Sequence, residues 1–200
     1  MTQTFAPLAA VWEITMACNM RCRHCGSACT VAQPGELTTA EALTLCDELA
    51  DMGLKMVTLS GGEPLLRHDW PDIARRFTDR GVVVMMISNG WFFNSQVIEK
   101  ARDSGVESIG ISLDGPEKTH DSIRQKGAFA RVMRALEQMS KENFTSSVVT
   151  TVMKYNLFQL PEMKAILEET GVSRWQFQLG VPMGQLAKNR SQVIDPGQIQ

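Results

Sequence analysis

Residues 10–25 are Ala-Val-Trp-Glu-Ile-Thr-Met-Ala-Cys-Asn-Met-Arg-Cys-Arg-His-Cys, a short apolar run followed at once by a loop of cysteines. The run at 10–15 has the length and composition of a β-strand. The loop places its cysteines at positions 18, 22 and 25, in the spacing C-x3-C-x2-C. Chemically active residues at the carboxyl end of a strand are typical of α/β folds, so this stretch predicts both the first strand and the first candidate site.

The same order of a short apolar run and a longer amphipathic run recurs along the chain. Strands are predicted at 10–15, 55–59, 82–87, 108–113, 146–153 and 173–179. Helices are predicted between them at 39–52, 69–80, 95–104, 128–141 and 158–170. This alternation indicates parallel strands joined by right-handed crossovers.

Several predicted helices carry end signals. Thr38 followed by Glu41 has the pattern of a capping box before the first helix. Glycines suited to a left-handed position after a helix occur at 53, 81, 105 and 171. These signals support the predicted helix boundaries.

The loops after the strands decide between a doubly wound sheet and a barrel. Polar, Gly-rich or Cys-rich segments follow the strands at 18–25, 61–64, 88–90, 112–115, 154–156 and 181–184. A doubly wound sheet concentrates its chemistry at one switch point, whereas a barrel distributes it over all its strand ends. We therefore expect an α/β fold with a partial (β/α)6 barrel, resembling a TIM barrel, over residues 1–190.

The last ten residues follow a different pattern. Asp195 before Pro196 is typical of a helix N-cap and its first residue. Residues 191–200 are therefore predicted to begin a helix of a C-terminal region that has been truncated.

Composition and charge exclude several classes of protein. The 200 residues carry 20 Lys and Arg against 22 Asp and Glu, a net charge of −2, which argues against nucleic acid as the partner. The hydrophobic content of 44% excludes intrinsic disorder. No apolar run approaches the ~20 residues that span a bilayer, and the N-terminus lacks a secretory signal, so a cytoplasmic protein without a membrane partner is expected.

Cysteine usage points to metal chemistry. Four of the five cysteines, at 18, 22, 25 and 29, lie within twelve residues, which favours a metal or cluster site in a reducing compartment over disulfides. Three clustered thiolates suit an iron–sulfur cluster. A zinc site with Cys29 or His24 as fourth ligand is the alternative. Cys46, on the apolar face of the first predicted helix, is expected in the core, and Cys29 is expected to pack under the loop.

Further motifs follow the later strands in a fixed order. They are Gly61-Gly62-Glu63-Pro64, Ser88-Asn89-Gly90, Ser112-Leu113-Asp114-Gly115 and His120-Asp121-Ser122-Ile123-Arg124. Together with the cysteine loop, this series resembles the radical S-adenosylmethionine enzyme superfamily, over about residues 10–190. It is similar to the branch whose members often carry a C-terminal SPASM or twitch domain with auxiliary clusters. No cysteine follows Cys46, so these residues cannot supply auxiliary clusters.

The resemblance implies a ligand set for a [4Fe–4S] cluster. Cys18, Cys22 and Cys25 would each bind one iron, and the amino and carboxylate groups of S-adenosylmethionine would bind the fourth. Reductive cleavage of the sulfonium would yield a 5′-deoxyadenosyl radical that abstracts hydrogen from a substrate. An electron donor, either a reductase or a flavodoxin- or ferredoxin-like protein, is implied.

The resemblance also implies residues that contact S-adenosylmethionine. These are Gly61, Gly62, Glu63 and Pro64 at the methionine ammonium, His24 and Val181 near adenine, Ser88, Asn89, Ser112 and Asp114 at the ribose and methionine, and Arg124 at the methionine carboxylate. Local alternatives stay open: turn formation for Asn89 and Asp114, a structural or zinc-binding His24, and a solvated Arg124 at a helix start.

The expected function is modification of a peptide, or maturation of a cofactor, by this radical chemistry. A tetrapyrrole substrate, as in haem biosynthesis, is an alternative within the same class. From other classes, a zinc-bound module or a non-catalytic cluster-binding protein would also use the cysteine loop, but neither explains the motifs after the later strands.

Overall fold

The computed structural model of the chain describes residues 6–198. Six parallel strands form one sheet in the order of the sequence. They are β1 (Ala9–Glu13), β2 (Met56–Ser60), β3 (Val83–Ser88), β4 (Val106–Ser112), β5 (Ser146–Val152) and β6 (Arg174–Leu179). Each strand pairs in parallel with the next, from β1–β2 to β5–β6. All six predicted strands are confirmed, with ends shifted by a residue or two.

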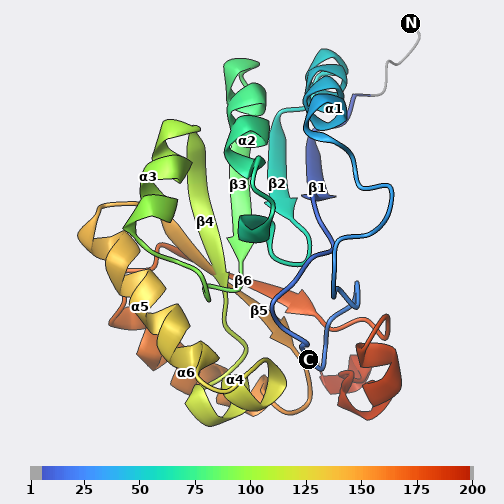
Figure 1. Cartoon of the computed structure of the whole chain (residues 1–200). Helices are drawn as coiled ribbons and strands as arrows, with labels where there is room; N and C mark the ends of the chain where they lie inside the picture. Colours follow the sequence, from blue (N-terminus) through green and yellow to red (C-terminus); the bar gives the residue numbers. More distant parts are fainter. Residues whose placement is uncertain (1–5, 199–200) are drawn as a thin grey trace, which may run out of the picture.

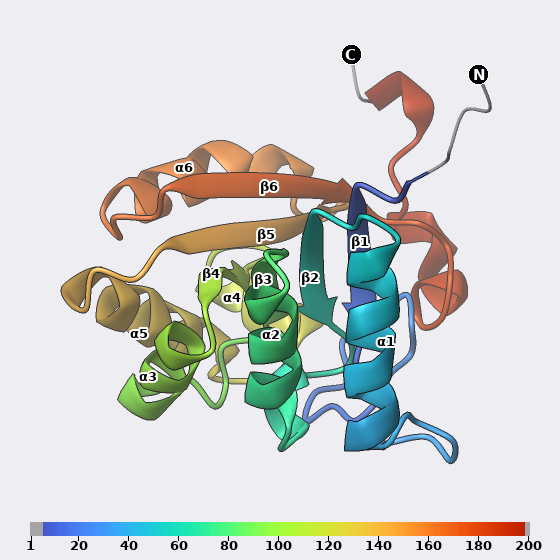
Figure 2. The same ribbon diagram turned by 90° about the horizontal axis from the view of Figure 1, so that it is seen from above.

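The helices lie on the outer face of this sheet. They are α1 (Thr39–Asp51), α2 (Trp70–Asp79), α3 (Ser95–Asp103), α4 (Glu117–Ile123), α5 (Ala128–Lys141) and α6 (Leu160–Glu168). Seen from above, the sheet curls so that β5 and β6 turn across the molecule towards β1, with the helices outside (Figure 2). Because β1 and β6 remain the outer strands of the order within residues 6–198, the curl stops short of a closed barrel. The expected partial α/β barrel is confirmed (Figure 1).

The core lies between the sheet and the helices. Alternate strand residues such as Val57, Leu59 and Ile109 are completely buried against helix residues such as Phe77 and Leu136. Alternation along a strand sends the intervening side chains to the inner face of the curl. The outer face is therefore committed to packing, and the inner face is left for a site.

Two parts of the chain differ from the prediction or go beyond it. Helix α4 was missed because residues 117–123 show no apolar helical period; its start follows Pro116 in the loop after β4. Two 3-10 helices, η1 (Pro64–Leu66) and η3 (Leu186–Gln192), were not predicted, while η2 (Leu157–Gln159) covers the first turn of the helix predicted at 158–170. The predicted C-terminal helix is described only as a 3-10 turn, η4 (Pro196–Gln198), and residues 199–200 lie outside the described part.

The predicted helix ends are confirmed where the structure tests them. Thr38 accepts from the Glu41 backbone N–H, while the Thr38 backbone N–H donates to the Glu41 carboxylate at 2.9 Å. The four glycines that follow α1, α2, α3 and α6 have φ angles between +73° and +94°. Among residues 6–198, no helix is long and apolar enough to cross a membrane.

Thr38→Ala is expected to lower the free energy of unfolding by about 1 kcal/mol, because the Glu41 backbone N–H loses its acceptor and the Glu41 carboxylate loses the Thr38 hydroxyl. Chemical denaturation measures the change. Thr44→Ala, on an exposed turn of the same helix, is the control and should not destabilise the protein. An equal decrease in the free energy of unfolding of both variants would show that the capping box does not stabilise the protein.

Candidate active site

A cavity of about 370 Å³ opens on the inner face of the curled sheet, between the strands and the loops at their carboxyl ends. Most of the sequence-predicted site residues line it. They are Cys18, Cys22, His24, Cys25, Gly61, Gly62, Ser88, Asn89, Ser112 and Arg124. Segments far apart in the sequence therefore meet around one space, as a binding site requires.

Four of the predicted contact residues do not line this cavity. Glu63 and Asp114 are completely buried behind it, Pro64 is buried at the start of η1, and Val181 is 58% exposed. Direct contact of these side chains with S-adenosylmethionine therefore stays a prediction.

The cysteine loop is pinned at both ends by backbone hydrogen bonds. Cys18 N donates to Thr30 O at 3.1 Å, and Thr30 N donates to Met16 O at 3.1 Å, so the loop leaves and returns at one point. Within it, Cys25 N donates to Cys22 O at 3.2 Å. The three thiols are partly exposed, and all face the cavity.

The thiols of this loop differ in acidity. Burial raises the pKa of Cys22 to about 11 and also raises the pKa of Cys18. A hydrogen bond from Cys29 lowers the pKa of Cys25 to about 5. Cys29 is 5% exposed and contacts Met16 Sδ at 3.8 Å, so it packs under the loop as expected, and it also borders the cavity. Cys46 is completely buried in the core, which confirms the prediction.

The donor set suits a cluster better than a single ion. Among residues 6–198, no three His, Cys, Asp or Glu side chains are grouped to hold one metal ion. The irons of a [4Fe–4S] cluster occupy separate corners of a cube, so three thiolates that line one cavity can each bind a different iron. His24 Nε2 lies 3.2 Å from the Asp114 carboxylate, while its Nδ1 has no hydrogen-bond partner among the described residues. The residues present fit a [4Fe–4S] cluster.

Gly61 and Gly62 bring the loop after β2 against the start of the cysteine loop. Gly62 N donates to Thr15 O at 2.7 Å, and the next amide donates to Ala17 O at 2.8 Å. A Cβ at Gly62 would overlap the Ala17 carbonyl, lying 2.6 Å from its carbon, and Gly61 has φ +137°. The glycines are therefore required for this backbone contact, whatever else binds beside them.

Glu63 joins the ends of β2 and β3. Its carboxylate accepts from Ser88 Oγ at 2.9 Å, Asn89 N at 2.8 Å and Leu65 N at 3.2 Å. Burial raises its pKa to about 7, although these donors favour the charged form. Ser88 and Asn89 are thereby fixed at the cavity wall, and Asn89 Nδ2 also donates to Asn19 Oδ1 of the cysteine loop at 2.8 Å.

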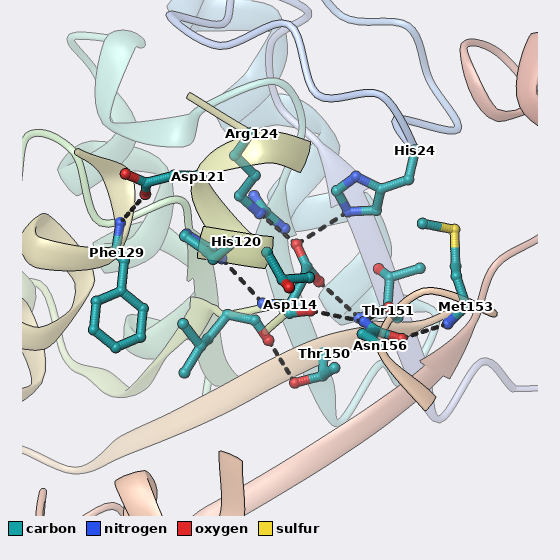
Figure 3. Close-up of polar contacts among 12 residues, drawn as sticks. His24, Asp114, His120, Asp121, Arg124, Phe129, Thr150, Thr151, Met153 and Asn156 are labelled. Atoms are coloured by element: carbon teal, nitrogen blue, oxygen red, sulfur yellow. Dashed lines mark hydrogen bonds and ion pairs between the residues drawn. The ribbon is translucent and has the colours of Figure 1, made fainter. Parts of the chain in front are cut away.

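Arg124, at the end of α4, lines the cavity and forms an ion pair with Asp114. Its Nε donates to Asp114 Oδ2 at 2.5 Å, and its side chain is 10% exposed (Figure 3). Burial alone would raise the pKa of Asp114, but Arg124 and His24 beside it hold that pKa well below its usual range. The alternative of a solvated Arg124 is wrong, because its side chain is packed against the buried Asp114 carboxylate. Turn formation at Asp114 stays open.

Sequence reasoning missed a polar lining contributed by the strands themselves. Thr58, Ser60, Ser108, Ser147, Thr151, Gln176 and Gln178 line the cavity. Part of their signal was present: polar residues alternate with apolar ones in β2 and β6, which marks a second, solvated face.

Curated relatives match most of the chain. The AdoMet-dependent heme synthase of Methanosarcina barkeri is 40% identical over 184 residues, covering 90% of this chain and 53% of the relative. The mycofactocin maturase MftC of Mycobacterium ulcerans is 34% identical over 170 residues, covering 84% of this chain and 46% of the relative. The chain spans about half the length of the curated relatives it matches.

Solved structures share the fold. Streptococcus suis SuiB bound to S-adenosylmethionine superimposes with a TM-score of 0.76 at 16% identity, covering 86% of this chain and 40% of SuiB. The protein anSMEcpe with bound AdoMet gives a TM-score of 0.74 at 17% identity, covering 88% of this chain and 52% of that one. The model of the Radical SAM superfamily matches residues 12–165. Because that match runs through the cysteine loop and through strands β2 to β5 around the cavity, the chain belongs to the radical SAM superfamily, which uses a [4Fe–4S] cluster and S-adenosylmethionine.

Proposed function

We propose that this chain is the catalytic core of a radical S-adenosylmethionine enzyme. Cys18, Cys22 and Cys25 would hold the [4Fe–4S] cluster, and the cavity beside them would hold S-adenosylmethionine. One observation carries the proposal: three thiols and a buried arginine line the same cavity. An electron-transfer protein would need the thiols but would have no use for the arginine.

When bound, the two cofactors supply reductive cleavage of the sulfonium and hydrogen abstraction from a substrate. The chain's own residues bind and orient. The cysteine loop gives up its thiol protons as it takes the cluster. Arg124 offers its guanidinium to the methionine carboxylate, while Ser88, Asn89 and Ser112 offer hydroxyl and amide groups to ribose and methionine.

The substrate we propose is a tetrapyrrole. The 40% identity to a protein named as a heme synthase supports this choice over the peptide substrate expected first. The strand side chains that line the cavity are uncharged hydroxyls, amides and apolar groups, and the sheet is open between β1 and β6 within residues 6–198. A peptide substrate is the second candidate, supported by the 34% identity to a mycofactocin maturase. A reductase or a flavodoxin- or ferredoxin-like donor would supply the electron.

Anaerobic reconstitution with iron and sulfide tests the proposed function. We expect about four irons per chain, a reduced-cluster signal that changes on addition of S-adenosylmethionine, and 5′-deoxyadenosine after addition of dithionite. Iron-coproporphyrin III should accelerate 5′-deoxyadenosine formation if the substrate is a tetrapyrrole, and a precursor peptide should not. A zinc-loaded, colourless protein, or a cluster that never cleaves S-adenosylmethionine, would overturn the proposal.

A further inference from the structure

Only one of the three guanidinium nitrogens of Arg124, a residue that lines the cavity, has a protein hydrogen-bond partner among the described residues. Its Nε is bound to Asp114, whereas its two terminal nitrogens take no hydrogen-bond partner among residues 6–198. The side chain is 10% exposed, and Arg124 is part of the cavity lining. A guanidinium in this state has one edge fixed by protein and other donors free for an anion, and its planar fork suits a carboxylate.

Asp114 is held from every side and cannot itself meet a ligand in the cavity. Its Oδ1 accepts from Thr151 N at 2.9 Å, while its Oδ2 faces Arg124 Nε and His24 Nε2. Its backbone is fixed as well, because its N–H donates to His120 Nδ1 at 3.1 Å and its carbonyl accepts from Asn156 Nδ2 at 2.8 Å. Figure 3 shows Arg124 and His24 directed at the carboxylate, while His120 and Asn156 lie beside the backbone of Asp114.

The same carboxylate oxygen also holds the cysteine loop. His24 lies between Cys22 and Cys25, and its side chain is 6% exposed where it meets Asp114 at 3.2 Å. One oxygen atom therefore fixes both the ring inside the cluster loop and the guanidinium in the cavity. Such a shared anchor sets the position of two binding elements relative to each other.

We propose that Asp114 is a positioning residue that aims the free edge of Arg124 at the carboxylate of S-adenosylmethionine and registers it against the cluster loop through His24. This inference rests on the proposed function. It replaces the expected direct contact of Asp114 with the cofactor by an indirect role. Asp114 then contributes to recognition of the methionine carboxylate, although its own oxygens never touch it.

The test measures binding, not turnover. Cluster-loaded wild-type protein is titrated anaerobically with S-adenosylmethionine and with its decarboxylated analogue, and the ratio of the two dissociation constants reports recognition of the carboxylate. Asp114→Asn should weaken binding of S-adenosylmethionine by about 10- to 100-fold and leave the analogue nearly unaffected, because an anchoring partner has been lost. The preference for the carboxylate should therefore fall to the part that binding of this carboxylate to the cluster iron would supply.

Two further variants keep the result interpretable. Asp121→Asn is the matched control, since Asp121 lies on α4 and accepts from Phe129 N at 2.8 Å without touching Arg124 or His24; it should keep the wild-type preference. Arg124→Lys keeps the charge but has a single ammonium, which cannot bind Asp114 and the ligand in the same geometry. It should lose the preference as Asp114→Asn does, even if the latter variant fails to fold.

The outcomes separate the two proposals. Failure of the wild-type protein to bind a cluster or S-adenosylmethionine would sink the proposed function itself. Equal affinity of the wild type for the two ligands would refute carboxylate recognition by Arg124. If Asp114→Asn or Arg124→Lys keeps the full preference while the wild type shows it, the positioning role is wrong and the function stands.

Discussion

Replacing Cys22 with alanine is expected to abolish both cluster binding and reductive cleavage of S-adenosylmethionine. Cys22 is the middle ligand of the proposed set, and it lines the cavity together with Cys18 and Cys25. Burial raises the pKa of its thiol to about 11, so the cluster must displace a proton there and cannot use a preformed thiolate. Iron analysis and quantification of 5′-deoxyadenosine after reconstitution measure the loss.

Cys29→Ala is the matched control, four residues beyond Cys25 in the same loop. Cys29 is buried and hydrogen-bonded to Cys25, but the three-cysteine set is complete without it. This variant should keep its iron and its cleavage activity, with at most a modest loss of stability. If it loses the cluster as fully as Cys22→Ala, the assignment of ligands is wrong and Cys29 belongs in the site.

Gly62→Ala is the second change with a large expected effect, although it removes no chemical group. The new Cβ would lie 2.6 Å from the Ala17 carbonyl carbon and 3.0 Å from Cys18 Cβ. The carbonyl belongs to the backbone, so no side-chain rotation relieves the overlap, and the start of the cysteine loop must move. Overpacking of this kind costs about 1–3 kcal/mol. We expect a lower free energy of unfolding and poor cluster retention, measured by denaturation and iron content.

Gly26→Ala provides the comparison for the stability measurement. Gly26 belongs to the same loop, but a Cβ there meets no heavy atom of the described residues within 4 Å. Its free energy of unfolding, measured without cluster, should stay within about 0.5 kcal/mol of wild type. Equal destabilisation by both substitutions would mean that loss of glycine flexibility, not the contact with Ala17, causes the effect.

Local sequence was sufficient for much of the fold. Six strands and five of the helices follow from periodicity, because a period of two or of 3.6 residues is written into consecutive positions. Thr38 and Glu41 predict the start of α1 for the same reason, because a capping box is formed by residues close together in the sequence. Helix α4 has no apolar period to read, and its Asp121 is satisfied by backbone amides several residues away, so it was missed.

Most of the residues that line the candidate site could be predicted from the sequence, but their contacts could not. Cys18, Cys22 and Cys25 could be named from spacing, and the cavity brings them together with Ser112 and Arg124 as expected. The roles of Glu63 and Asp114 could not be read in this way. Both were expected to accept hydrogen bonds from a ligand. In the structure, each carboxylate accepts from a backbone N–H far along the chain, Asn89 N for Glu63 and Thr151 N for Asp114.

The sequence by itself determined the order of strands and helices, the spacing of the three cysteines proposed to bind a cluster, and which loops follow which strands. These depend on residue type, spacing and neighbours within a few positions. Only the tertiary structure decided that Asp114 faces His24 and Arg124 at once, that Gly62 packs on Ala17, and that small polar side chains line the inner face of the sheet. Those contacts join residues brought together by the curl of the sheet, and burial and charge pairing depend on what surrounds a side chain in space.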